Sequence, residues 1–553
     1  MALILDLKAA IREFVRDGEV VALEGFTHLI PSAAGHEIIR QRRRDLTLVR
    51  MTPDLIYDQL IGMGCARKLV FSWGGNPGVG SLHRLRDAIE HGWPRPLEIE
   101  EHSHAGMATA YAAGAANLPF GVLRGYLGSD LPKYNPRVKF IDCPFTGERL
   151  AAVPAIRPDV AVVHAQQADR KGNVLLWGIV GVQKEVVMAA RRSIVTVEEI
   201  VERLRRARTP WCCPDGWWAP YARFRAAHFR PTRWVTIRAT IHFISSGTRS
   251  RASARALPAG SSVTCSRPRT SRSSGAGLLR RSLRRAASVR LRRPMAEPQY
   301  SADEMMTVAA ARMLRDRVVC FVGIGLPSAA ANLARLTHAP NAVLIYESGT
   351  IGAKPSVLPL SIGDGELAET ADTVVSITEI FAYWLQGCRV DVGFLGAAQI
   401  DRFANLNTTV VGDYRSPQVR LPGAGGAAEI ACSAREVLIM LRQSKRAFVA
   451  KLDFVTSAGY LDGGDRRDKL GMPGRGPSAV ITDLGILTPD PLTKELTLTS
   501  LHPGVTAEQA IAATGWPLKI AADLAETAAP SAAELAVLRD LNERTARAHA
   551  AGA

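Results

Sequence analysis

One local pattern occurs twice in this chain, and the repetition constrains the fold more than any other feature of the sequence. Residues 20–34 and 318–330 each contain an apolar run, a glycine, a proline and helix-forming residues, in that order. The pattern predicts a buried strand, a tight turn and a helix with the proline in its first turn. We therefore expect two related α/β units in a chain of 553 residues, which is long enough for two or three domains.

A second pair of similar stretches follows the first in the same order. Residues 167–174 and 399–406 both contain Gln-x-Asp-Arg and then an asparagine. The proline and the aspartate are 138 positions apart in the first half and 74 in the second, so the first half has about 64 additional residues, which we place between 72 and 140. Any two α/β units share strand–turn–helix patterns, but two pairs of similar stretches in the same order favour common ancestry of the two halves.

Glu347 is the candidate catalytic residue. It follows the apolar run 342–346, which is typical of a buried strand, and it precedes Ser348 and Gly349. A carboxylate at the end of a strand, on a glycine turn, can face a substrate while its backbone stays rigid. Glu347 lies twenty positions after the proline of its half, where the first half has Met51. If the halves superpose, only the second half has a carboxylate at this position.

The sequence resembles the family I coenzyme A transferases, which consist of A and B subunits of related fold. The Glu-Ser-Gly of residues 347–349 matches the family's catalytic glutamate motif and is most similar to the glutaconate CoA-transferase branch, since other branches have Ser-Glu-Asn-Gly. The A-type signature is Gly-Gly-Phe with a later Gly-x-Pro. In its place this chain has Glu-Gly-Phe at residues 24–26 and Leu-Ile-Pro at residues 29–31.

The resemblance implies an α/β fold with two related open domains of the CoA-transferase type, joined by an irregular arginine-rich segment. We expect an A-like domain at residues 1–205, an aberrant linker at 206–294 and a B-like domain at 295–553. The similarity itself extends over about 1–205 and 296–530. It also implies acyl-CoA and carboxylic acid substrates, coenzyme A as a substrate with no tightly bound cofactor, and paired A-like and B-like domains in a homo-oligomer.

The resemblance gives Glu347 the role of nucleophile, through a mixed anhydride and then a glutamyl-CoA thioester. Each tetrahedral intermediate needs hydrogen-bond donors for its oxyanion. Gly425 and Gly426 are the best candidates, because a backbone without side chains can approach a ligand closely. The alternative for these glycines is a flexible turn before a helix. Gly25 and Phe26 are expected to line the opposite wall of the site.

Four further residues are candidates for substrate contacts. Gln399 belongs to a polar cluster that is expected beside the active site, where it would bind substrate. Gly323, Gly325 and Asn405 are the candidate CoA-binding residues. As an alternative, the two glycines shape a tight strand–helix turn, since they lack the dinucleotide-binding fingerprint. Asp401 and Asn405 could likewise hold a turn.

The composition disfavours several classes of protein. No run of 18 or more apolar residues predicts a membrane span, and the first residues have no secretory signal pattern. The eight cysteines are scattered without a Cys-x-x-Cys pair, which indicates neither a disulfide framework nor a zinc site and fits a reducing cytoplasm. Glu98, Glu100, Glu101, His102 and His104 are conceivable metal ligands, but the helical His-Glu-x-x-His spacing is absent, so we expect no metal and favour a polar cleft wall.

The net charge of +17 comes from one segment. Residues 203–294 contain 22 arginines, no lysine and one acid, a net of +21, which leaves −4 for the rest of the chain. Such a segment is consistent with an arginine-rich arm that binds nucleic-acid phosphates. Natural basic arms normally contain lysine as well, however. Out-of-frame reading of GC-rich DNA yields the arginine, serine, alanine, proline, cysteine and tryptophan found here.

We therefore expect a frameshift near residues 205–208, with translation entering the B-like gene at about Met295. When residues 208–233 are read one frame over with GC-rich codons, the peptide contains Val-Pro-Gly-Gly-Ala-x-Pro-Ser-Tyr, which resembles A-type subunits. The Met-Ala-Glu-Pro that begins at residue 295 reads as a start. On this hypothesis residues 207–294 have no evolved fold, and the A-like domain has lost its C-terminal part.

Two other functions stay open on the residues alone. Hydrolases that open a ring of a CoA-linked steroid catabolite resemble the same A/B pair but use an acid on the A side, for which the candidate here is Glu101. A nucleic-acid-binding protein would act through the arginine-rich segment, with salt-dependent binding. Retention of Glu347 with its Ser-Gly turn favours CoA transfer. Glutaconate, 3-oxoacids and steroid-derived acids are all open as the acyl group.

Overall fold

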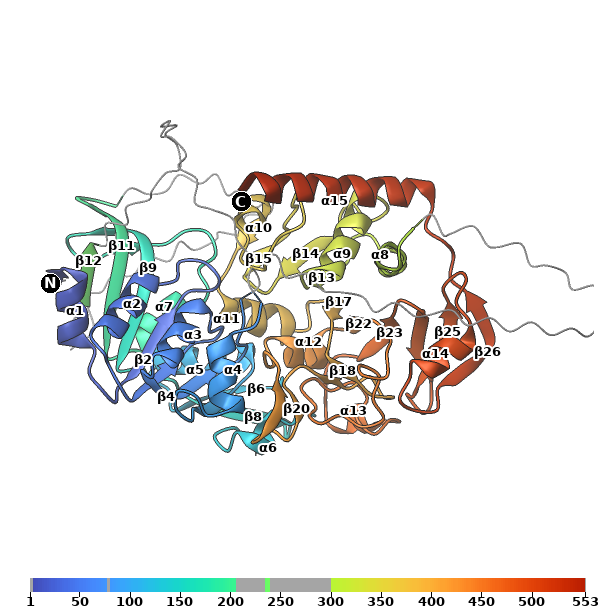
Figure 1. Ribbon diagram of the computed structural model, residues 1–553, viewed down its shortest axis with the longest axis horizontal. Coiled ribbons are helices and arrows are strands. Elements are labelled where there is room, and N and C mark those ends of the chain that lie inside the picture. The colour runs from blue at the N-terminus through green and yellow to red at the C-terminus, as the bar shows by residue number, and fades with distance from the viewer. Residues whose placement is uncertain (1–2, 77–79, 205–233, 239–299, 553) are drawn as a thin grey trace, which may run out of the picture. The chain divides into compact units, whose positions relative to one another are not determined.

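The computed structural model describes residues 3–76, 80–204, 234–238 and 300–552 (Figure 1). Of the segment expected to be aberrant, residues 206–294, it therefore describes only the backbone of β12 (Trp234–Arg238). This strand pairs in parallel with β1 (Leu3–Leu5) and β11 (Arg192–Val201). The rest of that segment lies outside the described residues.

A mostly parallel sheet of nine strands forms the centre of the first half. Its order is β1-β12-β11-β9-β2-β3-β4-β5, and the short β10 pairs antiparallel with β9. Parallel strands are buried on both faces, which explains the continuous apolar runs in the sequence. The remaining strands of the sheet are β2 (Val20–Glu24), β3 (Leu46–Val49), β4 (Ala66–Phe71), β5 (Glu98–Glu101), β9 (Val160–Asp169) and β10 (Val174–Leu175).

Helices cover both faces of this sheet. Alternate residues of β2 pack on opposite faces of the sheet. Val21 and Leu23 pack in a core with α1 to α4, whereas Ala22 packs in a core with α5 and α7. Asp54 and Ser103 fix the starts of α3 and α5, since their side chains accept backbone hydrogen bonds there. The helices are α1 (Leu7–Phe14), α2 (Ser32–Arg40), α3 (Leu55–Gly62), α4 (His83–Glu90), α5 (His104–Ala115) and α7 (Gln183–Ala189).

The second half contains a sheet of ten strands in the order β16-β15-β14-β13-β17-β22-β23-β24-β25-β26. Its centre, from β14 to β23, is parallel, whereas β24 pairs antiparallel with both of its neighbours. The strands are β13 (Val319–Val322), β14 (Val343–Tyr346), β15 (Thr350–Ile351), β16 (Thr373–Val374), β17 (Val392–Leu395), β22 (Glu436–Met440), β23 (Pro477–Ile481), β24 (Gly485–Pro489), β25 (Leu496–Leu501) and β26 (Lys519–Glu526).

Helices also cover both faces of the second sheet. One face packs against α8 (Ala302–Arg312), α9 (Leu326–Leu336) and α15 (Ala532–Gly552), the long C-terminal helix in Figure 1. The other face packs against α11 (Ile377–Glu379), the π-helix η1 (Ile380–Leu385) and α12 (Ala427–Ser433). Within the described ranges, no helix is both long and apolar enough to cross a membrane.

The two halves share one arrangement of strands. The order β11-β9-β2-β3 in the first half matches β22-β17-β13-β14 in the second, with all neighbours parallel in both. This match confirms the predicted pair of related α/β domains. The longer connection of the first half contains β4, β5, α5 and a three-stranded antiparallel sheet of β6 (Phe120–Leu123), β8 (Arg149–Pro154) and β7 (Lys139–Asp142).

The second pair of similar stretches, residues 167–174 and 399–406, forms the same turn in both halves. The carboxylate of Asp169 accepts hydrogen bonds from the backbone N–H of Lys171 and from the backbone and side chain of Asn173. The carboxylate of Asp401 accepts the equivalent bonds from the backbone N–H of Phe403 and from the backbone and side chain of Asn405. These bonds hold a compact Asx-type turn.

The halves contact each other through one continuous apolar core. The core cluster that contains Met107 of α5 and Val186 of α7 also contains Phe381 of η1 and Ile430 of α12. The face of the first sheet that carries α5 and α7 therefore packs against the face of the second sheet that carries η1 and α12.

Candidate active site

Glu347 follows β14 at the carboxyl end of the parallel strands, which is where open α/β sheets bind ligands. The chain turns at once, because the N–H of Gly349 donates to the carbonyl of Tyr346 at 3.0 Å and Gly349 has a φ of 103°. A Cβ at Gly349 would lie 2.0 Å from the carbonyl oxygen of Val375, so the turn requires glycine. The Glu347 side chain is 17 % exposed, so it can meet a substrate.

A histidine from the first half contacts this carboxylate. His104 is the first residue of α5, and its Nδ1 lies 2.5 Å from Oε1 of Glu347. Its Nε2 lies 3.1 Å from the hydroxyl of Thr52, which follows β3. The imidazole is 2 % exposed and has the rings of Phe26 and Phe381 edge-on at 5.8 and 6.0 Å. The site is thus shared by both halves of the chain.

The glycine-rich loop lies on the other side of Glu347. It joins β21 (Pro417–Arg420) to α12 and is held against the first half, since the carbonyl of Gly425 accepts from the N–H of His104 at 2.8 Å. A Cβ at Gly426 would lie 2.3 Å from Oε1 of Glu347. That Cβ would also lie 2.6 Å from Cζ of Phe381, so glycine leaves room for both side chains in the positions seen here.

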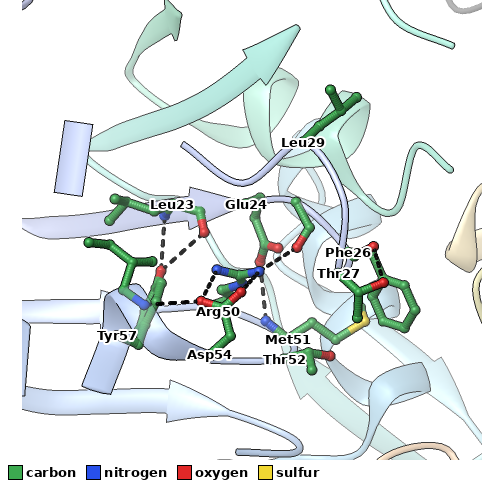
Figure 2. A network of polar contacts seen from close by, with 12 residues as sticks. Leu23, Glu24, Phe26, Thr27, Leu29, Arg50, Met51, Thr52, Asp54 and Tyr57 are labelled. Carbon is green, nitrogen blue, oxygen red and sulfur yellow. Dashed lines mark hydrogen bonds and ion pairs between the residues drawn. The ribbon is translucent and has the colours of Figure 1, made fainter. Parts of the chain in front are cut away.

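Gly25 and Phe26 form part of the first-half wall. Phe26 is buried and packs its ring against His104. The carbonyl of Gly25 accepts a hydrogen bond from Arg50 at 2.7 Å, and a Cβ at Gly25 would lie 2.6 Å from the carbonyl oxygen of Leu29. Figure 2 shows how the buried network around Arg50 holds this turn. The glycine at position 25 is therefore required by the close packing of its own loop.

A second carboxyl group lies near Glu347. Glu429, in the first turn of α12, is buried and accepts a hydrogen bond from the hydroxyl of Ser103 in the first half. Burial raises its pKa to about 8, and the negative charge of Glu347 acts in the same direction. Glu429 is consequently uncharged at neutral pH, which leaves Glu347 without an anionic neighbour at this point.

The coenzyme A transferase family model matches residues 4–213 and 303–513, which is more than half of the chain. The chain belongs to the coenzyme A transferase family. Its two halves match the two subunits of one enzyme, the 3-oxoadipate CoA-transferase of Pseudomonas knackmussii. The A-type subunit of that enzyme is 74 % identical over 204 residues (37 % of this chain, 72 % of the subunit's length), and the B-type subunit is 68 % identical over 250 residues (45 % and 96 %).

The transferase is also similar to more distant proteins. The B-type subunit of the glutaconate CoA-transferase of Acidaminococcus fermentans is 35 % identical over 246 residues (44 % of this chain, 92 % of the subunit's length). The crystal structure of an acyl-CoA transferase from Escherichia coli O157:H7 has the same fold, with a TM-score of 0.67 at 14 % identity and 95 % of both chains covered. An A-like and a B-like subunit are thus joined in one chain, as the sequence predicted.

Asn405 and Gln399, which were predicted to bind CoA and substrate, form hydrogen bonds within their own half of the transferase. Asn405 uses its amide within the turn described above and with Leu461, while its carbonyl oxygen accepts from the N–H groups of Gly459 and Leu461. Gln399 accepts from Asn407 at 2.7 Å. These bonds support the structural interpretation of both side chains.

The two glycines after β13 serve different purposes. Gly325 caps the N-terminus of α9 with a φ of 80° and lines a cavity of about 530 Å³ between α8, α9 and α15. A Cβ at Gly323 would meet only Pro327, at 3.8 Å, so Gly323 is not required by packing. The CoA-binding roles predicted for Gly323, Gly325 and Asn405 stay predictions.

The acidic residues considered as metal ligands are engaged in ion pairs. Burial opposes ionisation of Glu100, but hydrogen bonds from His102 and Lys68 outweigh it and lower its pKa to about 2. The carboxylate of Glu101 is buried, 2.7 Å from Arg420 Nη2 and 2.9 Å from the hydroxyl of Tyr414. Across the residues that the structure describes, no group of three or more His, Cys, Asp or Glu is placed to hold a metal ion.

Sequence reasoning missed the functional contacts of His104, Thr52 and Glu429. The Glu-His-Ser-His run contains several ligand-type residues, so the sequence suggested His104 as part of a polar cleft wall or as a metal ligand, and not as the partner of Glu347. Its partner Glu347 is 243 positions away, so no local spacing could reveal the contact. The only local signal is Ser103, a residue type that favours a helix start and therefore places His104 at the first turn of α5.

Proposed function

We propose that the two halves form one CoA transferase in which Glu347 is the nucleophile. The observation that carries this proposal is the position of its carboxylate. It lies at the end of a central parallel strand, is partly exposed, and is enclosed by His104 of the first half and Gly426 of the second. A side-chain carboxylate is a suitable nucleophile for this exchange, because the anhydride that it forms is reactive enough to return.

The reaction has two steps that are then reversed with a second acid. An oxygen of Glu347 attacks the carbonyl carbon of the acyl-CoA, the C–S bond breaks, and a mixed anhydride and the CoA thiolate result. The thiolate attacks the glutamyl carbonyl carbon, the bond to the bridging oxygen breaks, and a glutamyl-CoA thioester and the free acid result. The acceptor carboxylate passes through the same steps in reverse, so the thioester's energy is retained.

Backbone N–H groups of the glycine-rich loop are the proposed donors for the oxyanion of the substrate. Gly426 lies next to Glu347, so its N–H is the better placed of the two donors, since the N–H of Gly425 already donates to the carbonyl of Ser72 at 3.4 Å. The loop is held because the carbonyl of Gly425 accepts from the N–H of His104. Preorganised donors stabilise a developing oxyanion more than a mobile loop can. Gly25 and Phe26 complete the wall on the side of the first half.

We propose 3-oxoadipate as the carboxylic acid substrate. Both halves are 68–74 % identical to subunits of a 3-oxoadipate CoA-transferase, whereas the B-like half is 35 % identical to the glutaconate enzyme. The test is a comparison of 3-oxoadipate and glutaconate as CoA acceptors at equal concentration. A kcat/KM for glutaconate that equals or exceeds the value for 3-oxoadipate would contradict this substrate.

The nucleophile is tested by chemical trapping. The full chain is incubated with 3-oxoadipyl-CoA without an acceptor acid and then treated with borohydride, which reduces a thioester to an alcohol. Mass spectrometry is expected to find this reduction at Glu347 and at no position in Glu347→Ala. Transfer activity that persists in Glu347→Ala would rule out the mechanism.

The hydrolase alternative has less support from the geometry. It depends on Glu101 as an acid on the A side, and the Glu101 side chain is 0 % exposed, paired with Arg420 and hydrogen-bonded to Tyr414. The nucleic-acid-binding alternative depends on the arginine-rich segment, whose side chains lie outside the described residues.

We further propose that residues 206–294 result from a change of reading frame. The A-like half matches 72 % of the related A-type polypeptide, whereas the B-like half matches 96 % of the B-type polypeptide. A frameshift after the first 205 residues accounts for this difference and for the excess of arginine. Sequencing of the DNA across the junction decides the question, because an intact frame with these codons would contradict the proposal.

A further inference from the structure

His104 belongs to the first half of the chain yet touches the atom at which the proposed reaction occurs. Its Nδ1 lies 2.5 Å from Oε1 of Glu347, across the contact between the halves. The imidazole is buried between Phe26 and Phe381, so its plane has little freedom to turn. This contact places a ring nitrogen against a carboxylate oxygen, and hydrogen bonds to a charged acceptor are stronger than neutral ones.

The two contacts of the ring assign its protons. A carboxylate oxygen can only accept, so Nδ1 must carry a hydrogen and donate to Glu347. The hydroxyl of Thr52, 3.1 Å from Nε2, can donate to that nitrogen when the imidazole is neutral and accept from it when the imidazole is charged. The donor therefore faces Glu347 in either state.

A buried ionic network holds the turn after β3 that leads to Thr52 (Figure 2). Arg50 donates to the carbonyl of Gly25 at 2.7 Å and to both carboxylate oxygens of Asp54 at 3.1 Å. The N–H of Met51, next to Thr52, donates to Oε1 of Glu24 at 3.2 Å. Arg50 and Met51, the two residues before Thr52, thus tie the loop after β3 to the end of β2 and the loop that follows it.

We propose that His104 donates from Nδ1 to the glutamyl carbonyl oxygen and stabilises the oxyanion that forms on Glu347, with Thr52 as the residue that positions the ring. This inference rests on the proposed role of Glu347 as nucleophile. Oε2 attacks the acyl-CoA and becomes the bridging oxygen of the anhydride, while Oε1 stays the carbonyl oxygen beside His104.

In the second step, negative charge develops on Oε1, the atom that His104 contacts. When the CoA thiolate attacks the glutamyl carbon, the C–S bond forms and the carbonyl electron pair moves onto Oε1. When the intermediate collapses, that pair returns, the bond to the bridging oxygen breaks, and the free acid leaves as its carboxylate. His104 keeps its proton throughout, so it acts as a fixed dipole where charge develops. Gly426 leaves the space that this oxygen occupies.

The test compares two amides that place a donor at different ring positions. In His104→Asn the amide nitrogen can occupy the position of Nδ1, whereas in His104→Gln it reaches the position of Nε2. The full chain is mixed with 3-oxoadipyl-CoA in a single turnover, and the borohydride-trapped thioester on Glu347 is followed over time. We expect the rate to fall by about 10²–10³-fold in His104→Gln and by no more than about 10-fold in His104→Asn.

Thr52 provides an independent check on positioning. Thr52→Val keeps the shape but removes the hydroxyl, and we expect a loss of about 10-fold in the single-turnover rate. Thr52→Ser is expected to restore most of that rate. Because His104 acts on the intermediate, KM should change less than kcat in all four variants.

The outcomes separate this inference from the proposed function. A Glu347 thioester that forms at the wild-type rate in His104→Gln would overturn the role of His104 and leave the nucleophile intact. Asn and Gln variants that lose equal activity would overturn it as well, since a donor at Nδ1 would then have no special effect. Absence of a thioester in the wild-type chain would overturn both. Thermal melts identify a variant that has not folded, and the Thr52 pair then decides.

Discussion

At the scale of single residues, the orientation of the proposed nucleophile, Glu347, depends on the space around one carboxylate oxygen. Oε1 of Glu347 lies 2.5 Å from Nδ1 of His104 and 2.3 Å from the position that a Cβ at Gly426 would take. Nδ1 of His104 can donate to Oε1 only if the two atoms come within hydrogen-bonding distance. A methyl group added at Gly426 therefore tests whether the position of Oε1 matters.

We expect Gly426→Ala to displace this oxygen, since the new Cβ would lie 2.3 Å from it. The backbone at Gly426 has a φ of −92°, which alanine adopts without strain. The new Cβ would also lie 2.6 Å from Cζ of the buried Phe381, so a thermal melt must show that the variant is folded. Misplacement of a reacting group by about 1 Å can cost about 10²-fold in rate, and we expect a loss of that size in thioester formation.

The matched control is Gly365→Ala. Gly365 begins α10 (Gly365–Thr370), and a Cβ there would meet nothing within 4 Å. We expect wild-type activity from this variant. Equal activities of the two alanine variants would contradict the steric role of Gly426.

Glu429 shows how burial changes the pH dependence of stability. Its pKa rises from 4.5 to about 8, chiefly because of burial, while the hydrogen bond from Ser103 opposes the rise. Between these pH values the folded protein keeps a proton that the unfolded chain has released. The contribution of Glu429 to stability therefore falls as the pH rises from about 4.5 to about 8 and levels off above.

We expect Glu429→Gln to lose this part of the pH dependence, because the amide is neutral at every pH. The melting temperature of the variant minus that of the wild type should rise between pH 5 and pH 8, by the equivalent of about 1–3 kcal/mol. Burial also raises the pKa of Glu24, to about 7, so Glu24 makes the stability fall with rising pH in the same way. This effect is the same in the variant and in the wild type, so it does not enter the difference between their melting temperatures. A difference that stays constant with pH would contradict the neutral form of Glu429.

At the scale of elements, the end of β5 is tied to β21 by a buried ion pair. Glu101 and Arg420 have side chains that are 0 % and 2 % exposed, with the charged atoms 2.7 Å apart. The guanidinium also lies 5.4 Å from the ring centre of Phe71 and 5.7 Å from that of Tyr414. This pair joins an A-like strand to the loop that leads to the glycines of the site.

We expect Arg420→Leu to destabilise the protein by about 3–5 kcal/mol, because it leaves the carboxylate of Glu101 buried without a counter-charge. The double variant Glu101→Leu, Arg420→Leu should be more stable than the single variant, since no buried charge is left. Denaturant unfolding measures both. A double variant less stable than the single would contradict this interpretation.

The exposed pair of Arg442 and Asp303 is the control. Its side chains are 62 % and 48 % exposed, and its atoms are 2.8 Å apart. Water and salt screen such a pair, so Arg442→Leu should cost at most about 1 kcal/mol.

The sequence predicted the elements far better than it predicted the contacts between them. Strand, turn and helix are local patterns, so the two α/β units and the strand-end position of Glu347 were correct. The contact between Glu347 and His104 joins residues 243 positions apart and depends on how two sheets pack, which no local spacing encodes. Asn405 was ambiguous for another reason, because the amide that could bind CoA is equally suited to hold its own turn.

At the scale of the whole molecule, every described residue of the site lies in residues 3–204 or 300–552. The apolar core between the halves and the pair of Glu101 with Arg420 also come from these ranges. The described residues all belong to one compact unit, which does not include residues 241–299. The catalytic unit should therefore not depend on the sequence of that segment.

We expect replacement of residues 241–299 by a glycine–serine linker of equal length to leave the rate of Glu347 thioester formation within about two-fold of the wild type, since such a linker acts as a flexible tether. Single-turnover trapping measures the rate, and thermal melts report on the fold. A loss of more than about ten-fold would assign the segment a part in the chemistry and contradict the two-half site.

The shared apolar core has a consequence for assembly in the cell. Each half leaves a hydrophobic face uncovered until the other half is present, so separate A and B polypeptides would have to be made in equal amounts and find each other by diffusion. A covalent tether makes that encounter intramolecular, at an effective concentration that can reach the millimolar range. Every copy of the chain then carries both the proposed nucleophile, Glu347, and the proposed donor, His104, whatever its expression level.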